Sequence, residues 1–266
     1  MTLVLRGRER GIATLTLDSP ANRNALSARL VDELAQALGD CARDETVRAV
    51  VLTHTGTVFS AGADLKAPPN PYTFVALLRQ LVTLPKPVVA RIDGRVRAGG
   101  IGLVGACDLA AASAGSDFAF TEVRLGVAPA VISLPLLPRM DPRAAERYYL
   151  TGERFGAAEA VRTGLLTVAS EDAGGDADAD AGSGSVSGSV SGSGVDRVLA
   201  PLLDGLRRAS PQGLAAAKQL LAARVLETFE RDAEDLVQRS ASLFASPEAR
   251  EGMTALLERR DPAWVL

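Results

Sequence analysis

Residues 98–108 read AGGIGLVGACD, a run of glycine and apolar residues with no charge before Asp108. The apolar stretch Val88–Ile92 precedes this run, and a second β-type stretch, Leu109–Ala112, follows it. Glycines at the beginning of a helix leave backbone N–H groups unpaired, and the helix dipole places partial positive charge at that end. The run therefore predicts a strand, a glycine turn and a helix whose first N–H groups can bind an oxygen atom of a ligand.

Short β-type stretches alternate with helical patterns on both sides of this run. Residues 27–43 have apolar side chains at helical spacing, with Ser27 as the expected N-cap. Strands that alternate with helices favour an α/β fold. The predicted strands are Ile12–Leu17, 47–54, Val88–Ile92, Leu109–Ala112 and 118–120, and the predicted helices are 27–43, 72–84, 141–150 and 157–163.

The last third of the chain has a different composition. Residues 171–194 consist almost entirely of Asp, Ala, Gly, Ser and Val, which cannot bury enough apolar surface to offset the entropy of ordering. Residues 195–257 have a helical pattern that is interrupted at Ser210-Pro211 and Ser246-Pro247, each a serine cap followed by proline. We expect a core of residues 1–194, with a flexible loop at 171–194, and a helical domain of residues 195–266.

Composition argues against several classes of function. The net charge of −3 provides no basic field for nucleic acid or an anionic membrane. Neither a secretory leader nor a long apolar stretch is found, and the two cysteines form no disulfide framework, so we expect a cytoplasmic protein. With His54 as the single histidine, a metal site is not expected, and we interpret His54 as structural.

Two further segments contain groups suited to catalysis. Residues 59–66, FSAGADLK, follow a predicted strand, and their small side chains leave backbone N–H groups accessible to a ligand. Residues 120–127, FTEVRLGV, place the carboxylate of Glu122 at the end of another β stretch. Two N–H donors from separate segments can form an oxyanion hole, and a carboxylate in an apolar pocket has a raised pKa suited to proton transfer.

The order and spacing of these segments resemble the crotonase superfamily, the enoyl-CoA hydratases and isomerases. The similarity runs from Ile12 through Gly164 and resumes near Val195. The matching motifs are PANRNALS (20–27), SAGADLK (60–66), PKPVVA (85–90), Asp93-Gly94, Gly99-Gly100 through Cys107-Asp108, Glu122 through Gly126, LTGE (150–153), SPEAREGM (246–253) and Arg260-Asp261-Pro262.

This resemblance implies a spiral of β-β-α repeats, followed by a C-terminal helical domain that drives assembly into a homotrimer or into a hexamer of two trimers. It also implies an acyl-CoA substrate, whose thioester carbonyl is held by the backbone N–H groups of Ala63 and Gly99 while Glu122 transfers protons. The enolate that forms at the α carbon is stabilised by those two donors. No cofactor is implied, since coenzyme A is part of the substrate.

The same matching implies a coenzyme A site between two loops. Arg23 is expected near the phosphates or the pantetheine entry, and Lys66 beside the adenine. Both charges have the alternative interpretation of ordinary surface residues. The positions implied for coenzyme A binding are Arg23, Ala25, Ala61, Asp64, Leu65 and Lys66.

One position departs from the two-carboxylate hydratases of this superfamily. Those enzymes carry a first glutamate three residues after the oxyanion glycine, and this chain has Gly102 there. Adding water in the standard way uses two carboxylates, whereas moving a double bond needs one. However, residues 100–108 and 122–133 resemble bacterial 3-methylglutaconyl-CoA hydratase-like proteins, which also carry glycine at this position.

We therefore expect an enzyme that hydrates a short or branched enoyl-CoA in fatty-acid, leucine or isoprenoid-acid breakdown. The alternatives are an enoyl-CoA isomerase that uses Glu122 alone and a non-catalytic acyl-CoA-binding protein. Arg95 and Arg97 flank the oxyanion segment and have two interpretations. They pair with the free carboxylate of a dicarboxylic substrate, or they face solvent or a neighbouring subunit.

Overall fold

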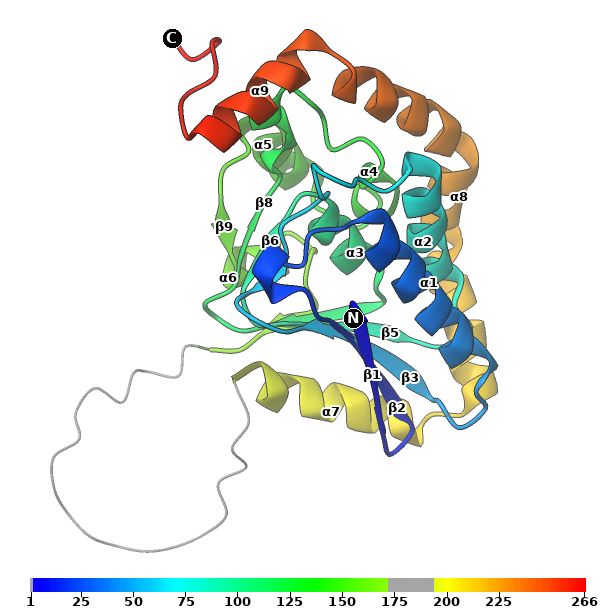
Figure 1. The fold of residues 1–266 in the computed structure, drawn as a ribbon. Coiled ribbons are helices and arrows are strands. Elements are labelled where there is room, and N and C mark those ends of the chain that lie inside the picture. The colour runs from blue at the N-terminus through cyan, green and yellow to red at the C-terminus, as the bar shows by residue number, and fades with distance from the viewer. Residues whose placement is uncertain (1, 172–193) are drawn as a thin grey trace, which may run out of the picture.

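Two β-sheets form the centre of the molecule (Figure 1). The structure is a computed structural model that describes residues 2–171 and 194–266. The larger sheet has the order β1-β2-β3-β5-β7-β10 and the smaller β4-β6-β8-β9. Their strands are β1 (Val4–Glu9), β2 (Ile12–Leu17), β3 (Ala49–His54), β4 (Val58–Ser60), β5 (Val88–Ile92), β6 (Arg95–Arg97), β7 (Leu109–Ala112), β8 (Asp117–Ala119), β9 (Phe155–Gly156) and β10 (Val168–Ala169).

The chain alternates between the two sheets as it advances. The units β3-β4-α2 and β5-β6-α3 each add one strand to each sheet and then one helix, α2 (Pro71–Thr83) or α3 (Gly99–Ala106). Neighbouring strands contributed by successive units are parallel, whereas the first pair, β1 and β2, and the last, β8 and β9, are antiparallel. The predicted α/β class with a spiral of β-β-α repeats is confirmed.

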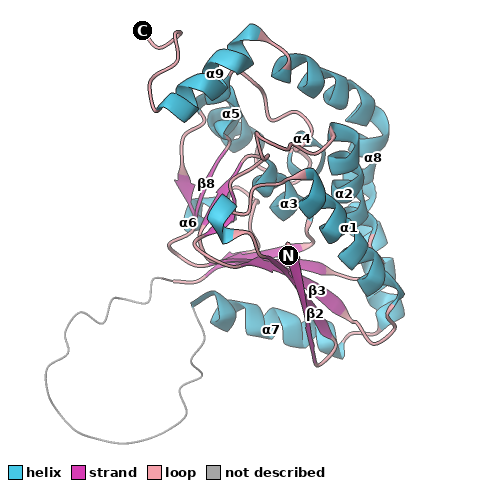
Figure 2. Ribbon diagram, viewed as in Figure 1, coloured by secondary structure: helices cyan, strands magenta, loops and turns pink. Residues whose placement is uncertain are grey.

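The central strand β3 is buried on both faces, as expected for parallel strands covered by helices. Val50 and Leu52 belong to the main core, which also receives side chains from α1 (Ala28–Arg43), α2 and α3. Ala49 and Val51 point to the opposite face, where α7 (Gly194–Arg208) covers the sheet (Figure 2). Strand side chains alternate between faces, so one strand contributes to both cores.

The remaining helices surround this core. The longest, α8 (Pro211–Phe244), packs along α2 and α4, and α9 (Pro247–Glu258) returns to contact η2 (Figure 1). The division at residue 194 stays a prediction, and the predicted flexible loop lies almost wholly outside the described residues. The other helices are η1 (Pro20–Asn22), η2 (Thr121–Leu125), α4 (Ser133–Leu136), α5 (Pro142–Thr151) and α6 (Ala157–Arg162).

Three predicted serine caps are confirmed. The side-chain oxygens of Ser27, Ser210 and Ser246 accept hydrogen bonds from backbone N–H groups three residues later, at 3.1–3.2 Å. Such caps satisfy donors that the first helical turn cannot pair. Within the described residues, no helix is long and apolar enough to cross a membrane.

Lys218 anchors α8 to the core. Its side chain is 6% exposed, and its ammonium group donates to the carbonyl oxygens of Leu81 and Lys86 and lies 2.7 Å from Asp108 Oδ2. Lys218→Met is expected to lower the free energy of unfolding by about 3 kcal/mol, because it leaves a largely buried carboxylate and two carbonyls without this donor. Urea unfolding measures the loss, with Lys66→Met on the surface as the control. Equal stability of both variants would contradict the anchoring role.

Candidate active site

Three parallel strands of the smaller sheet end at one edge, and a predicted segment follows each of them. β4 leads into Gly62 and Ala63, β6 into Gly99, and β8 into Glu122. The register pairs Val96 with both Ser60 and Phe118, so the three strands end at similar heights. Because the carboxyl ends of parallel strands meet at one edge, the fold brings these segments together.

The loops after β4 and β6 are in close contact. Gly62 has φ +92°, and a Cβ atom built on it would lie 2.9 Å from Ala98 Cβ and 3.7 Å from Gly99 N. Only glycine tolerates both this backbone angle and this close approach without strain. The glycine therefore brings Ala63 next to the beginning of α3.

The N–H groups of Ala63 and Gly99 are available for a ligand. Leu26 forms a parallel bridge with Ala63, in which Leu26 N donates to Gly62 O and Asp64 N to Leu26 O. The N–H of Ala63 itself therefore points away from Leu26. Gly99 is the first residue of α3, where an N–H has no partner inside the helix. No backbone bond outside the regular elements starts from either group in the described chain.

Ala98 holds the turn that aims Gly99. Its φ of 46° and ψ of −121° form a combination that residues with a side chain rarely adopt. Hydrogen bonds hold this conformation from both sides, since Ala98 N donates to Ala119 O and Ile101 N donates to Ala98 O. Strained residues that neighbours hold in place concentrate at functional sites, so this angle supports a functional role for the Gly99 N–H.

Glu122 is a buried carboxylate with an unused oxygen. Its side chain is 8% exposed, and its Oε2 atom has no hydrogen-bond partner among the described residues. Burial raises the pKa of Glu122 to about 7, while a hydrogen bond from its own backbone opposes the rise. A carboxyl group whose pKa lies near 7 exchanges protons readily in both directions at neutral pH.

The C-terminal motif SPEAREGM supports the turn that carries Glu122. Gly126 ends η2 with φ +74°, and a Cβ there would lie 2.6 Å from the carbonyl carbon of Glu248. A Cβ on Gly252 would similarly lie 2.6 Å from Leu125 O. Glycine at both positions lets α9 pack directly on the backbone of η2, which explains why a motif far along the chain belongs to this site.

The two loops implied to bind coenzyme A lie side by side. Ala61 N donates to Arg23 O, and the Asn22 side chain donates to Asp64 Oδ2. The side chains of Arg23 and Lys66 are exposed, and neither forms an ion pair within the described parts of the chain. Ala25 is buried beside them, Ala61 and Asp64 are half-buried, and Leu65 is exposed. The six predicted coenzyme A positions therefore share one side of the site.

A family model described as enoyl-CoA hydratase/isomerase matches residues 7–173, which is more than half of the chain. The chain belongs to the enoyl-CoA hydratase/isomerase family. A crystal structure of an enoyl-CoA hydratase from Mycobacterium avium is 48% identical, covers 100% of both chains and superposes with a TM-score of 0.86. An enoyl-CoA hydratase structure from Mycobacterium smegmatis is 30% identical, covers 98% of each chain and has a TM-score of 0.71. Carnitinyl-CoA dehydratase from Escherichia coli O157:H7 is 28% identical over 97% of this chain and 96% of its own.

Gly102, the position where two-carboxylate hydratases are expected to carry a glutamate, has no room for a side chain. A Cβ on Gly102 would lie 2.5 Å from Ile132 Cγ2 and 2.9 Å from Ile132 Cβ. Separations below 3.0 Å force a rearrangement. Ile132, which immediately precedes α4, therefore occupies the space that a residue at this position would need.

Both arginines of β6 already pair with a carboxylate of the protein. Arg97 forms an ion pair with Asp117 and donates to the carbonyl oxygens of Val96 and Asp117, and Arg95 Nε lies 3.8 Å from Asp117 Oδ2. Asp117 begins β8, whereas Glu122 follows its end. These pairings favour the structural interpretation of Arg95 and Arg97.

The single histidine occupies a structural position. His54 Nε2 accepts a hydrogen bond from Asp93 N at 3.1 Å, and Nδ1 lies 3.3 Å from Thr55 O. An accepting Nε2 requires the proton on Nδ1, so the ring is neutral. Burial lowers the pKa of His54, which agrees with this neutral form.

Sequence reasoning did not single out Tyr149 or Phe74 as individual residues beside this site. The Phe74 ring lies near Gly99, since a Cβ there would approach it to 3.6 Å. The ring centroid of Tyr149 lies 4.4 Å from that of Phe120, two residues before Glu122. Tyr149 and Phe74 occur in helical patterns that predict packing alone, so no sequence signal distinguished them. Two hollows of about 340 and 470 Å³ lie beside α8, and Ser133 lines the second of them.

Proposed function

We propose that this protein adds water across the double bond of a short or branched 2-enoyl-CoA, with Glu122 as the only catalytic carboxylate. In this mechanism the N–H groups of Ala63 and Gly99 hold the thioester oxygen. Glu122 takes a proton from water while the water oxygen bonds to C3. The electron pair of the double bond moves to the thioester and forms an enolate. Glu122 then returns the proton to C2, which completes a 3-hydroxyacyl-CoA.

The buried Oε2 of Glu122, which has no hydrogen-bond partner in the described part of the chain, is the observation that carries this proposal. A buried polar atom without a partner costs free energy, and a buried carboxylate with a raised pKa is typical of catalytic groups, so the two features together support a catalytic role for Glu122. The full-length similarity to chains named enoyl-CoA hydratase supports hydration, as does the similarity to a carnitinyl-CoA dehydratase.

A second candidate is an enoyl-CoA isomerase, in which Glu122 moves one proton between the α and γ carbons. The close packing of Ile132 against Gly102 favours it, because this leaves a single carboxylate for chemistry. Both candidates pass through the same kind of enolate, so they differ in whether a water molecule is added to the product.

Product analysis with several thioesters separates the candidates. Purified protein is incubated with crotonyl-CoA, a 3-enoyl-CoA and 3-methylglutaconyl-CoA, and products are followed by chromatography and mass spectrometry. A mass gain of one water is expected. A product of unchanged mass with a moved double bond would show that the enzyme is an isomerase. Binding of the thioesters without conversion would show that the protein is a non-catalytic acyl-CoA-binding protein.

The pH dependence of hydration reports the raised pKa of Glu122. Water activation requires the carboxylate form, and burial raises the pKa to about 7. We expect kcat/KM to rise about tenfold per pH unit below pH 7 and to level off above it. A carboxyl with an ordinary pKa near 4.5 would give a flat profile between pH 6 and 8. Initial rates with crotonyl-CoA from pH 5 to 9 distinguish the two.

We further propose a cytoplasmic homotrimer or a hexamer of two trimers, assembled through residues 195–266. Leu220 and Leu221 on α8 are about 80% exposed, and Leu256 and Leu257 on α9 are also exposed. Exposed apolar side chains on both helices support burial between subunits. Light scattering coupled to size exclusion measures the assembly.

A further inference from the structure

Tyr149 of α5 packs beside the end of β8, which precedes Glu122. Its ring packs on Phe120, and Glu122 lies two residues further along the chain, at the edge where β8 ends. Its hydroxyl oxygen lies 3.4 Å from Ser133 Oγ, and Ser133 directly follows Ile132, the residue that fills the space at Gly102. Tyr149 thus connects the surroundings of Glu122 with the position of the missing carboxylate.

The hydroxyl group of Tyr149 forms one weak hydrogen bond within the described residues. Hydroxyl pairs normally approach to 2.5–3.0 Å, so the 3.4 Å contact is weak. Ser133 has a stronger partner, since its hydroxyl donates to Pro129 O at 2.7 Å. Among the described residues Tyr149 has no other hydrogen bond, although the side chain is largely buried. A buried phenol with spare capacity can bind a further polar molecule.

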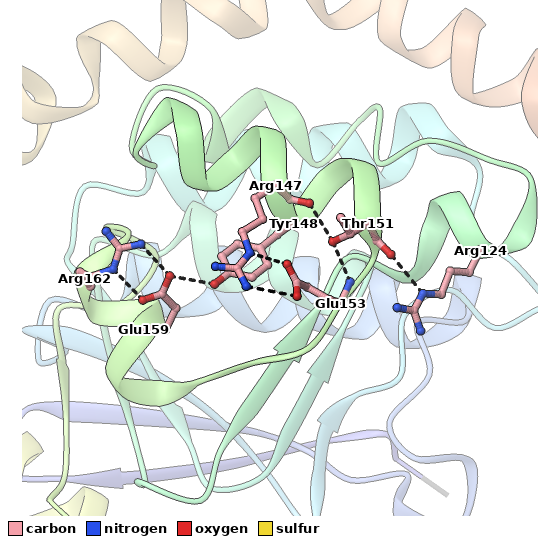
Figure 3. A network of polar contacts seen from close by, with 7 residues as sticks. All are labelled: Arg124, Arg147, Tyr148, Thr151, Glu153, Glu159 and Arg162. Carbon is pink, nitrogen blue, oxygen red and sulfur yellow. Dashed lines mark hydrogen bonds and ion pairs between the residues drawn. The ribbon is translucent and has the colours of Figure 1, made fainter.

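The hydroxyl group of the neighbouring tyrosine, Tyr148, is paired instead. Tyr148 donates to Glu159 at 2.8 Å, and its ring stacks on Phe155 at 4.1 Å. Figure 3 shows this hydroxyl inside a network that includes Arg147, Glu153 and Arg162. The Tyr148 hydroxyl therefore has a strong hydrogen-bond partner of its own, whereas the Tyr149 hydroxyl has only the 3.4 Å contact with Ser133 among the described residues.

The network also joins α5 to the turn that carries Glu122. Arg124 of η2 donates to Thr151 O at the end of α5, as Figure 3 shows. This hydrogen bond links the end of α5, the helix that carries Tyr149, to the turn that carries Glu122. Catalytic groups require such positioning, because small displacements of a reacting water reduce the rate strongly.

Resting on the hydratase function proposed above, we propose that the Tyr149 hydroxyl binds the attacking water together with Glu122 and replaces the second carboxylate. The water gives one proton to Glu122 and bonds through oxygen to C3, while the phenol holds it by a hydrogen bond and neither gains nor loses a proton. Burial and the charge of Glu122 both raise the pKa of Tyr149, which keeps the phenol neutral.

Tyr149→Phe tests this role, because it keeps the ring on Phe120 and removes only the hydroxyl. We expect kcat for hydration of crotonyl-CoA to fall about 100-fold with KM changed less than about twofold. Exchange of the α protons of butyryl-CoA in D2O requires only Glu122 and the two N–H donors, so it should continue at nearly the wild-type rate. Tyr148→Phe, the matched control, should keep both activities.

The two readouts separate catalysis from folding. Loss of hydration and exchange together in Tyr149→Phe would overturn the water-binding role, since it would indicate a displaced Glu122. Wild-type hydration by this variant would overturn the role of Tyr149 and leave the hydratase function intact. A wild-type protein that exchanges α protons and hydrates none of the thioesters would overturn the hydratase function itself, and this inference with it.

Discussion

Glu122→Gln is expected to lower kcat for enoyl-CoA hydration by about 10⁴-fold, the upper end of the range for a single acid–base group. Both proton transfers pass through this side chain in the proposed mechanism, and an amide of the same shape can perform neither. Glu146→Gln, an exposed residue paired with Arg143, is the matched control and should leave kcat unchanged. Residual hydration above a tenth of the wild-type rate would assign the proton transfers to another group.

The same variant should be more stable than the wild-type protein at pH 8. The pKa of Glu122 rises from about 4.5 in the unfolded chain to about 7 in the folded protein. Because the pKa of Glu122 is higher in the folded protein than in the unfolded chain, protonation of Glu122 stabilises the fold. This stabilisation is complete below pH 4.5 and is lost as the pH rises from 4.5 to 7. The shift in pKa corresponds to a loss of about 3 kcal/mol in the free energy of unfolding across this pH range.

Urea unfolding at two pH values tests this linkage. Glu122→Gln should exceed the wild-type free energy of unfolding by about 3 kcal/mol at pH 8 and match it near pH 4. Inactivity combined with higher stability would show that the substitution removes chemistry and leaves the fold intact. A variant that is less stable at both pH values would contradict the raised pKa and would weaken the kinetic conclusion.

Gly102→Glu, which introduces the carboxylate that the resemblance to two-carboxylate hydratases implies at this position, is expected to destabilise the fold by more than about 5 kcal/mol. The first atom of the new side chain would lie 2.5 Å from Ile132 Cγ2, and the carboxyl group would enter a fully buried region of α3. Overpacking and the burial of an unpaired polar group act together here. No gain in hydration is therefore expected from restoring the glutamate alone.

Two further variants test whether contact with Ile132 causes the loss of stability in Gly102→Glu. Gly115→Glu makes the same change in an exposed turn where a Cβ meets nothing within 4 Å, and its stability should change by less than about 0.5 kcal/mol. The double variant Gly102→Glu, Ile132→Gly should be more stable than Gly102→Glu alone, because it removes both contacting atoms. If Gly102→Glu alone folds normally and hydrates faster, Ile132 does not exclude a second carboxylate.

Several features of the site were predictable because they depend on local chemistry. The glycines of residues 98–108, the serine caps and the Glu122 segment each follow from conformational or hydrogen-bonding preferences of short stretches. Strand β6, by contrast, was not predicted, because Arg95-Val96-Arg97 has no apolar run and is ordered by pairing with β4 and β8. Strand β4 was likewise part of a predicted loop, although its three residues are buried.

The sequence by itself determined the family, the α/β class and the residue types available for chemistry, namely one buried carboxylate candidate and two glycine-rich or small-residue loops. Only the tertiary structure decided that Ile132 fills the space at Gly102, that Asp117 pairs with Arg95 and Arg97, and that Tyr149 packs on Phe120. These relations join residues far apart in the chain through side-chain packing. Packing depends on shape in three dimensions, which neither periodicity nor motif spacing encodes.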